Sequence, residues 1–224
     1  MNPRSAAPFA VLWDMDGVLV DSASYHKQAW QATFAREGIP FDAADMQRTF
    51  GWRNDSIIAD IMGSRLPPAR VGAIATAKEQ RFRETVRREG IATLPGVQEW
   101  LRGLHERGIL QAVVSSAPRE NITVVLQAAG VASLFEALIS GDEVAQGKPD
   151  PETYLRAAQR LGVLPTACVV VEDAPAGVEA ARRAGMACLA VTTSHPREHL
   201  AAADRVVDSL AGLSADTFAR LLRK

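Results

Sequence analysis

The chain has 224 residues, of which 47% are hydrophobic and 23% are charged, and its formal net charge is −1. This composition is typical of a globular protein with one core domain and room for a small insert. A nearly neutral chain has no overall field that would recruit nucleic acid or an anionic membrane, so we expect neither as a partner.

Two further features bear on the expected compartment. No apolar run approaches the roughly 20 residues that a membrane span needs, and the polar start MNPRSAAPF lacks the apolar core of a signal peptide. Cys168 and Cys188 sit in or beside apolar runs, which favours buried, reduced thiols over a disulfide. A cytoplasmic location is therefore expected by elimination.

Short apolar runs alternate with helical segments along most of the chain. The first run is FAVLW at 9–13, and the later ones lie at 110–116, 137–140, 167–173, 186–193 and 204–208. Runs this short and rich in Val, Leu and Ile are typical of strands buried on both faces. Between them, VQEWLRGLHERG and PETYLRAAQRLG have helical spacing and end at a glycine. The alternation predicts an α/β fold, a Rossmann-like parallel sheet with helices on both faces.

The alternation stops between the first two runs. No convincing strand is found over 22–91, and four stretches have helical character: SYHKQAWQATFAREG, DAADMQRTFG, RNDSIIADIMG and AKEQRFRETVRREG. We interpret 22–91 as an inserted helical cap domain, and 1–21 with 92–224 as the α/β core. On the last of these helices, the basic residues Lys78, Arg81 and Arg83 are expected to form a solvated face.

Chemically reactive side chains follow the predicted strands. Asp14 and Asp16 come directly after the first strand, and residues two apart in an extended chain point the same way. Ser115 ends the second strand, and Lys148 follows the third. The fourth ends in an acidic pair, Glu172 and Asp173. Each has an ordinary explanation as a helix cap or a loop residue, but parallel strands bring all of them to one edge of the sheet.

This combination of side chains indicates phosphoryl transfer. Carboxylates without clustered His or Cys favour a hard cation such as Mg²⁺, and a hydroxyl with an ammonium suits the oxygens of a phosphate. A carboxylate nucleophile can accept a phosphoryl group and so split a difficult displacement into two steps. The metal and the lysine would offset the repulsion between Asp14 and the phosphate.

The motifs resemble those of the haloacid dehalogenase superfamily, in its branch with a helical cap after the first strand. DMDGVLVDS resembles the first motif, VVSS the second, GKPDPETY the third and VVEDAPAGVEAARRAGM the fourth. The resemblance implies that Asp14 is the nucleophile and Asp16 the general acid and base. It also implies the ligand-binding residues: Ser115, Ser116 and Lys148 for the phosphoryl group, and Asp14, the Asp16 carbonyl and Asp173 for Mg²⁺, with Glu172 assisting directly or through water.

Within that branch the chain looks most like the β-phosphoglucomutase and sugar-phosphatase group. SASYHKQAW resembles the entry to the cap, and FGWRNDSI resembles the cap segment whose Arg grips the far end of the substrate. His26 and Arg53 are the resulting candidates for substrate contact, with Lys27 and Trp52 as weaker ones. Both have structural alternatives: His26 as an exposed helix residue, and Arg53 as a cap for a neighbouring helix or as an ion-pair partner of Asp55.

Three functions remain open at this point. The first is hydrolysis of a small phosphorylated metabolite, such as a sugar or polyol phosphate, by a monomer or weak homodimer. The second is a mutase of the β-phosphoglucomutase type, and the third is a non-catalytic binding protein on the same fold. We expect the phosphatase, because the mutase family has a Ser-Lys-Asn run after the second-motif serine where this chain has Ala117, Pro118 and Arg119.

Overall fold

The computed structural model describes residues 9–214 and 216–222. The chain divides into two compact units, of which one runs up to Asp21 and resumes at Ala92, and the other comprises Ser22–Ile91. No helix in these described residues is long and apolar enough to cross a bilayer.

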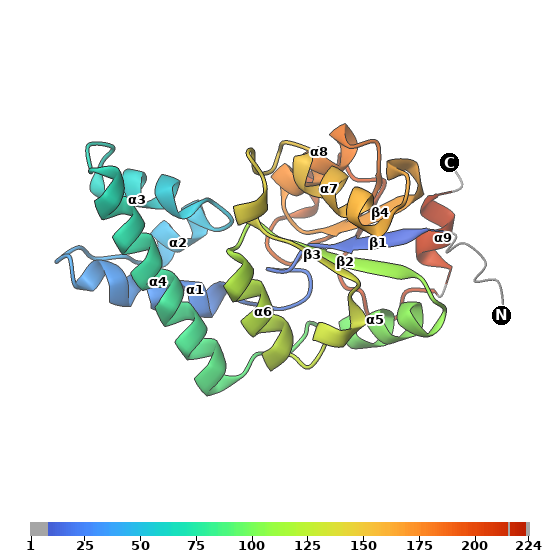
Figure 1. Ribbon diagram of the computed structural model, residues 1–224, viewed down its shortest axis with the longest axis horizontal. Helices are drawn as coiled ribbons and strands as arrows, with labels where there is room; N and C mark the ends of the chain where they lie inside the picture. The colour runs from blue at the N-terminus through green and yellow to red at the C-terminus, as the bar shows by residue number, and fades with distance from the viewer. Residues whose placement is uncertain (1–8, 215, 223–224) are drawn as a thin grey trace. The chain divides into compact units, whose positions relative to one another are not determined.

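The first unit contains a six-stranded parallel sheet in the order β3-β2-β1-β4-β5-β6 (Figure 1). Its strands are β1 (Ala10–Trp13), β2 (Leu110–Val114), β3 (Ala137–Ile139), β4 (Cys168–Glu172), β5 (Ala187–Val191) and β6 (Arg205–Val207). The central strand is β1, in which Trp13 is in register with Val113 of β2 and Val171 of β4. The carboxyl ends of β1, β2 and β4 therefore meet at one edge of the sheet.

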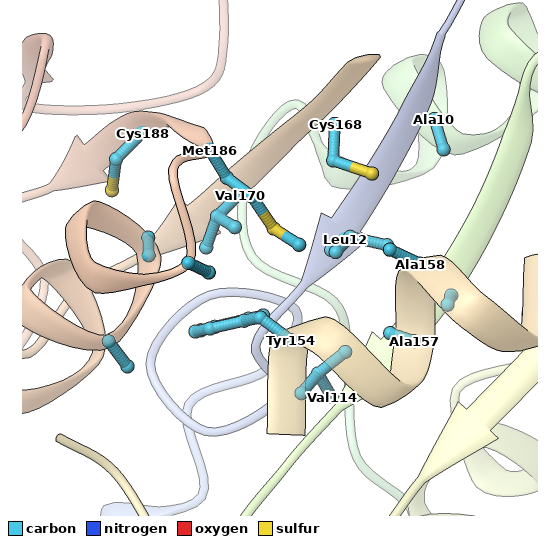
Figure 2. Packing of buried hydrophobic residues seen from close by; sticks show 14 of the residues in the cluster. Ala10, Leu12, Val114, Tyr154, Ala157, Ala158, Cys168, Val170, Met186 and Cys188 are labelled. Carbon is cyan, nitrogen blue, oxygen red and sulfur yellow. The ribbon is translucent and has the colours of Figure 1, made fainter. Parts of the chain in front are cut away.

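Helices cover both faces of this sheet. They are α5 (Val97–Glu106), α6 (Arg119–Ala128), α7 (Glu152–Leu161), α8 (Pro175–Arg183) and α9 (Thr217–Leu221). On one face α7 and α8 pack against the strands, and Figure 2 shows Tyr154 and Ala157 of α7 beside Leu12 and Val170. On the other face the Trp13 ring meets Phe218 of α9 edge to face at 5.7 Å. The predicted fold class, a parallel sheet with helices on both faces, is confirmed.

The second unit is built from helices. They are α1 (Ala23–Ala35), α2 (Ala43–Thr49), α3 (Asn54–Met62) and α4 (Pro68–Glu89). Trp30 stacks on Phe34 at a ring distance of 5.0 Å, and Phe41 packs beside them in the core of this unit. The last helix starts at Pro68, earlier than its predicted stretch, because proline is well suited to a first helical turn and the good helix formers Ala69 and Arg70 follow it.

The prediction that Lys78 lies on a solvated face is wrong. Only 3% of Lys78 is exposed, and its Nζ lies 2.9 Å from Glu79 Oε1 and 2.9 Å from His26 Nδ1. Lys78 is one helical turn before the buried Phe82, so both lie on the inner face of α4. The pairing with Glu79 explains how an ammonium group is accommodated there. Arg81 and Arg83 are half-buried.

Candidate active site

The turn after β1 brings the chain close to the end of β4. The Met15 carbonyl accepts hydrogen bonds from the N–H groups of Leu19 and Val20, and the Gly17 N–H donates back to Val20 at 2.8 Å. Gly17 has φ +82°, and a Cβ there would overlap the Asp173 carboxylate. Glycine is therefore required at this position both for the turn and for the close approach to Asp173.

Three carboxylates gather at this edge of the sheet. Asp14, Glu172 and Asp173 each offer an oxygen, and these oxygens lie within 4.8 Å of one another. The residues are 8%, 1% and 3% exposed, respectively. Buried carboxylates at such distances repel one another unless a cation or a proton lies between them.

Lys148 supplies one positive charge to this cluster. Its Nζ donates to Asp14 Oδ1 at 2.5 Å, to Glu172 Oε1 at 2.6 Å and to the Val114 carbonyl at 3.3 Å. The lysine side chain is 8% exposed, and its ammonium lies 5.0 Å from the centre of the Tyr154 ring. The loop after β3 thus places the buried ammonium of Lys148 beside Asp14, at the end of β1.

The pKa values of these carboxyl groups shift in opposite directions: those of Asp14 and Asp173 are raised, and that of Glu172 is lowered. Burial first, and then the nearby charges of Glu172 and Asp173, raise the pKa of Asp14 well above its ordinary value, although Lys148 opposes them. Burial and the Glu172 charge raise the pKa of Asp173 to about 7. Burial alone would raise the pKa of Glu172, but Lys148, Tyr154 and the Ala174 N–H lower it. The Lys148 charge thus keeps Glu172 ionised, but it does not suffice to stabilise negative charge on Asp14 and Asp173 as well.

These residues fit a divalent cation. The donor set consists of carboxylate oxygens, which hard cations such as Mg²⁺ prefer. The Oδ2 atom of Asp173 is buried without a hydrogen-bond partner among the described residues. The raised pKa values of Asp14 and Asp173 show the electrostatic cost that a second cation would remove.

The remaining core residues nominated from the motifs lie at the strand ends. Ser115 follows β2 and is 1% exposed, and its Oγ accepts a hydrogen bond from the Ala117 N–H at 3.1 Å. Ser116 is exposed, and Asp16 is half-buried in the turn after β1. The hydroxyl of Ser115 therefore stabilises the turn into α6 and retains its own proton for donation.

The nominated residues of the helical unit differ in exposure. His26 of α1 is half-buried and stacks on Phe82 of α4 at a ring distance of 4.1 Å. Arg53 precedes α3, and its Nε lies 3.5 Å from Asp55 in an exposed ion pair. Lys27 is half-buried, whereas Trp52 is 47% exposed.

Two residues near the carboxylates were not nominated from the sequence. Tyr154 of α7 donates its hydroxyl hydrogen to Glu172 Oε1 at 2.7 Å. A ring nitrogen of His195, in the loop after β5, lies 3.1 Å from the Asp173 carbonyl oxygen. Tyr154 belongs to the third motif, GKPDPETY. His195 follows β5, so a search for reactive side chains after every strand of the sheet would have found the histidine.

Comparisons with known proteins agree with this arrangement. A sequence model described as haloacid dehalogenase-like hydrolase matches residues 10–185. Validoxylamine A 7'-phosphate phosphatase of Streptomyces hygroscopicus subsp. limoneus is 35% identical, over 89% of this chain and 92% of that protein. Protein CbbY of Rhodobacter capsulatus is 31% identical, over 95% of this chain and 98% of that protein.

A solved structure shows the same architecture. The crystal structure of a CbbY variant from Rhodobacter sphaeroides in complex with xylulose-(1,5)bisphosphate superposes with a TM-score of 0.84. It is 28% identical, and the match covers 92% of this chain and 96% of that one. The predicted resemblance and the predicted enzyme class, a haloacid dehalogenase-like hydrolase, are confirmed. With a family match over most of its length and relatives above 30% identity along nearly the whole chain, the protein belongs to the haloacid dehalogenase-like hydrolase family.

Proposed function

We propose that the protein is a Mg²⁺-dependent phosphatase that hydrolyses a small phosphorylated metabolite, a sugar or polyol phosphate, through an aspartyl-phosphate on Asp14. The observation that carries the proposal is the buried contact between Lys148 and Asp14 beside Asp173. The names of the relatives support this function, since one is validoxylamine A 7'-phosphate phosphatase and another is fructose-1-phosphate phosphatase of Escherichia coli.

The proposed reaction has two steps. An Asp14 oxygen attacks phosphorus, the ester P–O bond breaks, and Asp16 gives its proton to the leaving alkoxide. Water then attacks the phosphorus of the aspartyl-phosphate, Asp16 takes the proton from that water, and inorganic phosphate leaves with the Asp14 carboxylate restored. Lys148 neutralises the phosphoryl oxygens in both steps, and Ser115 and Ser116 donate hydrogen bonds to them.

In this proposal Asp14, Asp173 and the backbone carbonyl of Asp16 hold Mg²⁺. When bound, the ion supplies the positive charge that lets an anionic phosphate approach an anionic nucleophile. The protein contributes buried carboxylates that lie close together with only one lysine to neutralise them, as the raised pKa values of Asp14 and Asp173 indicate.

We further propose that the helical unit acts as a cap that closes over the bound substrate. The division of the chain into two units joined near 21–22 and 91–92 supports two connecting segments that could act as hinges. His26 and Arg53, with Lys27 and Trp52 in minor roles, would contact the leaving group. Closure would exclude water from the phosphoryl site until the ester bond has broken.

The mutase is the second candidate, and the segment after Ser115 argues against it. A mutase must hold a second phosphate while the sugar reorients, which requires several donors. Ala117 has no donor in its side chain, and Pro118 lacks an N–H group. Arg119 uses Nη2 to donate to Glu143 at 2.6 Å and to the Leu138 carbonyl at 3.1 Å.

A non-catalytic protein on this fold is the third candidate. Such a protein has no need of the complete set of Asp14, Asp16, Ser115, Lys148 and Asp173. We therefore favour catalysis, and we propose that the enzyme acts in the cytoplasm as a monomer or weak homodimer.

A screen of phosphorylated metabolites tests the proposal. Phosphate release is measured for purified protein with and without Mg²⁺, starting from a generic aryl phosphate and continuing to sugar and polyol phosphates. We expect Mg²⁺-dependent release that is lost in Asp14→Asn. Release that persists in that variant, or no release from any ester, would contradict the proposed function.

A further inference from the structure

We propose that Glu79 is a positioning residue of the helical unit: its buried carboxylate holds both of the residues that are proposed to contact the leaving group. It reaches Arg53 through the neighbouring Asn54. It reaches His26 through Lys78. The inference deepens the proposed function and rests on it in one respect, which is that Arg53 and His26 contact the substrate.

One oxygen of Glu79 joins the helices of this unit. Glu79 Oε1 accepts hydrogen bonds from Asn54 Nδ2 of α3 at 2.7 Å and from Lys78 Nζ at 2.9 Å. The same Nζ lies 2.9 Å from Nδ1 of His26, which belongs to α1. Helix α4 packs against both α1 and α3 (Figure 1). A chain of polar contacts therefore crosses the unit from α1 through α4 to α3.

Burial makes this chain of contacts rigid. Lys78 is 3% exposed and Glu79 is 6% exposed. The Lys78 ammonium lies 5.2 Å from the centre of the Trp30 ring and 5.6 Å from that of Phe82. Burial alone would raise the pKa of Glu79, but the Lys78 charge helps to hold that pKa below its ordinary value. An ionised carboxylate thus fixes an ammonium that is surrounded by aromatic rings.

The contact with Lys78 sets the proton position on His26. An ammonium group has donors and no acceptor, so Nδ1 of His26 accepts its hydrogen bond. In a neutral imidazole the ring proton is then on Nε2, which makes that nitrogen the donor toward a substrate oxygen. Without the charge of Glu79, the buried ammonium loses its counter-ion and no longer holds Nδ1 in this state.

The contact with Asn54 sets the position of Arg53. Arg53 immediately precedes α3, and arginine is not one of the residues whose side chains cap helices. The first turn of α3 is instead anchored by the hydrogen bond from Asn54 to Glu79, and negative charge near the start of a helix adds to its stability. The ion pair of Arg53 with Asp55 lies on the surface and restrains the arginine only weakly.

Both effects concern recognition of the leaving group. The residues proposed for phosphoryl transfer itself, such as Asp14 and Lys148, belong to the other unit. A change at Glu79 should therefore alter the choice between substrates more than the chemistry at phosphorus. The informative quantity is the ratio of kcat/KM for the best metabolite of the screen to kcat/KM for acetyl phosphate, whose leaving group is small.

The first variant is Glu79→Gln, which keeps the shape of the side chain and one acceptor oxygen but removes the charge. Its matched control is Glu37→Gln, because Glu37 is a carboxylate of the same unit that forms an ion pair with Arg70. We expect the kcat/KM ratio to fall about tenfold in Glu79→Gln, the scale of one hydrogen bond to a charged group. It should stay within about twofold of the wild type in the control.

The second variant is Asn54→Ala, which interrupts only the link to α3. Its control is Gln31→Ala, because the Gln31 amide also donates within this unit, to the Phe41 carbonyl at 3.1 Å. The kcat/KM ratio should fall in Asn54→Ala and not in Gln31→Ala. In an Arg53→Ala background the further effect of Asn54→Ala should be less than about twofold, because both changes act on the same contact with the substrate.

Nitrogen-15 NMR of the His26 ring gives a measurement that needs no substrate. His26→Gln identifies the resonances, and Lys78→Met shows how they change when the ammonium is removed. We expect a single tautomer, protonated on Nε2, in the wild type, in Asn54→Ala and in both controls. In Glu79→Gln the resonances should shift toward those of Lys78→Met. Thermal unfolding confirms that each variant is folded.

Three results for Glu79→Gln would overturn the inference: a wild-type kcat/KM ratio, equal losses on the two substrates, or wild-type His26 resonances. If that variant does not fold, an undiminished effect of Asn54→Ala in the Arg53→Ala background would overturn it. If the wild type hydrolyses no phosphate ester, the proposed function fails, and the His26 resonances alone decide whether Glu79 positions the histidine.

Discussion

The ammonium of Lys148 lies 2.5 Å from the Asp14 carboxylate, although the two residues are 134 positions apart in the chain. A buried ion pair contributes little net stability, because desolvation of the charges offsets most of their attraction. One lysine also cannot neutralise three buried carboxylates. The cluster therefore needs either bound protons or a further cation, which supports the proposed metal site and the proposed chemistry at Asp14.

Asp14→Asn is expected to abolish turnover while leaving the fold intact. The amide is nearly isosteric with the carboxylate but is not a useful nucleophile toward phosphorus. Phosphate release should fall to the level of the blank, and circular dichroism should match the wild type. Near-normal turnover in the folded variant would rule out the nucleophile assignment.

Activity is expected to require a divalent ion, with Mg²⁺ the most effective. Asp173→Ala removes one anionic oxygen ligand, so its activity should need a higher Mg²⁺ concentration than the wild type. The measurement is a titration of chelated protein with Mg²⁺ for both forms. Full activity after exhaustive chelation would contradict this prediction, as would a specific need for zinc, which prefers Cys and His ligands.

Without a divalent ion, the stability of the protein should decrease as the pH rises toward neutrality. Burial and the Glu172 charge raise the pKa of Asp173 to about 7 in the folded state, whereas an unfolded Asp titrates at about 3.9. Between these values the folded protein holds a proton that the unfolded chain has released, so rising pH favours unfolding.

Thermal unfolding of chelated protein between pH 5 and pH 8 measures this effect against Asp173→Asn, whose side chain stays neutral. The melting temperature of the variant should exceed that of the wild type by an amount that grows with pH. Added Mg²⁺ should raise the wild-type melting temperature most at the alkaline end. A difference that is constant over this range would show that Asp173 does not titrate as described.

Much of this arrangement could be predicted from the sequence because strand ends obey a simple rule. Short apolar runs marked the strands, and a parallel sheet brings residues such as Asp14 and Asp173 to one edge whatever the details of packing. The hydrogen bond from Tyr154 to Glu172 could not be predicted in this way, because it depends on how α7 rotates against β4. The sequence does not predict the burial of Lys78, because lysine is usually exposed. In the structure the ion pair with the buried carboxylate of Glu79 and the position one turn before the buried Phe82 account for it.

Arg53→Ala is expected to impair the specific substrate far more than a small generic one. Arg53 is exposed and its contact with Asp55 is a surface ion pair, which contributes little to stability. We expect kcat/KM for the best metabolite of the screen to fall at least about tenfold, the scale of one lost charged hydrogen bond, and that for acetyl phosphate to change little. Arg48→Ala, which removes another exposed ion-paired arginine of this unit, is the control. Equal losses on both substrates would assign Arg53 a structural role.

The enzyme is expected to release phosphate and not to isomerise sugar phosphates. A mutase must protect its aspartyl-phosphate from water and must hold the distal phosphate of a bisphosphate. Here Ala117 has no donor in its side chain, and Pro118 lacks an N–H group.

The deciding measurement incubates the protein with β-glucose 1-phosphate, Mg²⁺ and a trace of the 1,6-bisphosphate. Free phosphate should be the main product, from this ester or from a better substrate of the screen. Glucose 6-phosphate that forms much faster than free phosphate would reverse the assignment. Arg53 in the helical unit would then be the first candidate for the distal phosphate, because it is exposed and held only by its 3.5 Å contact with Asp55 among the ion pairs of the described residues.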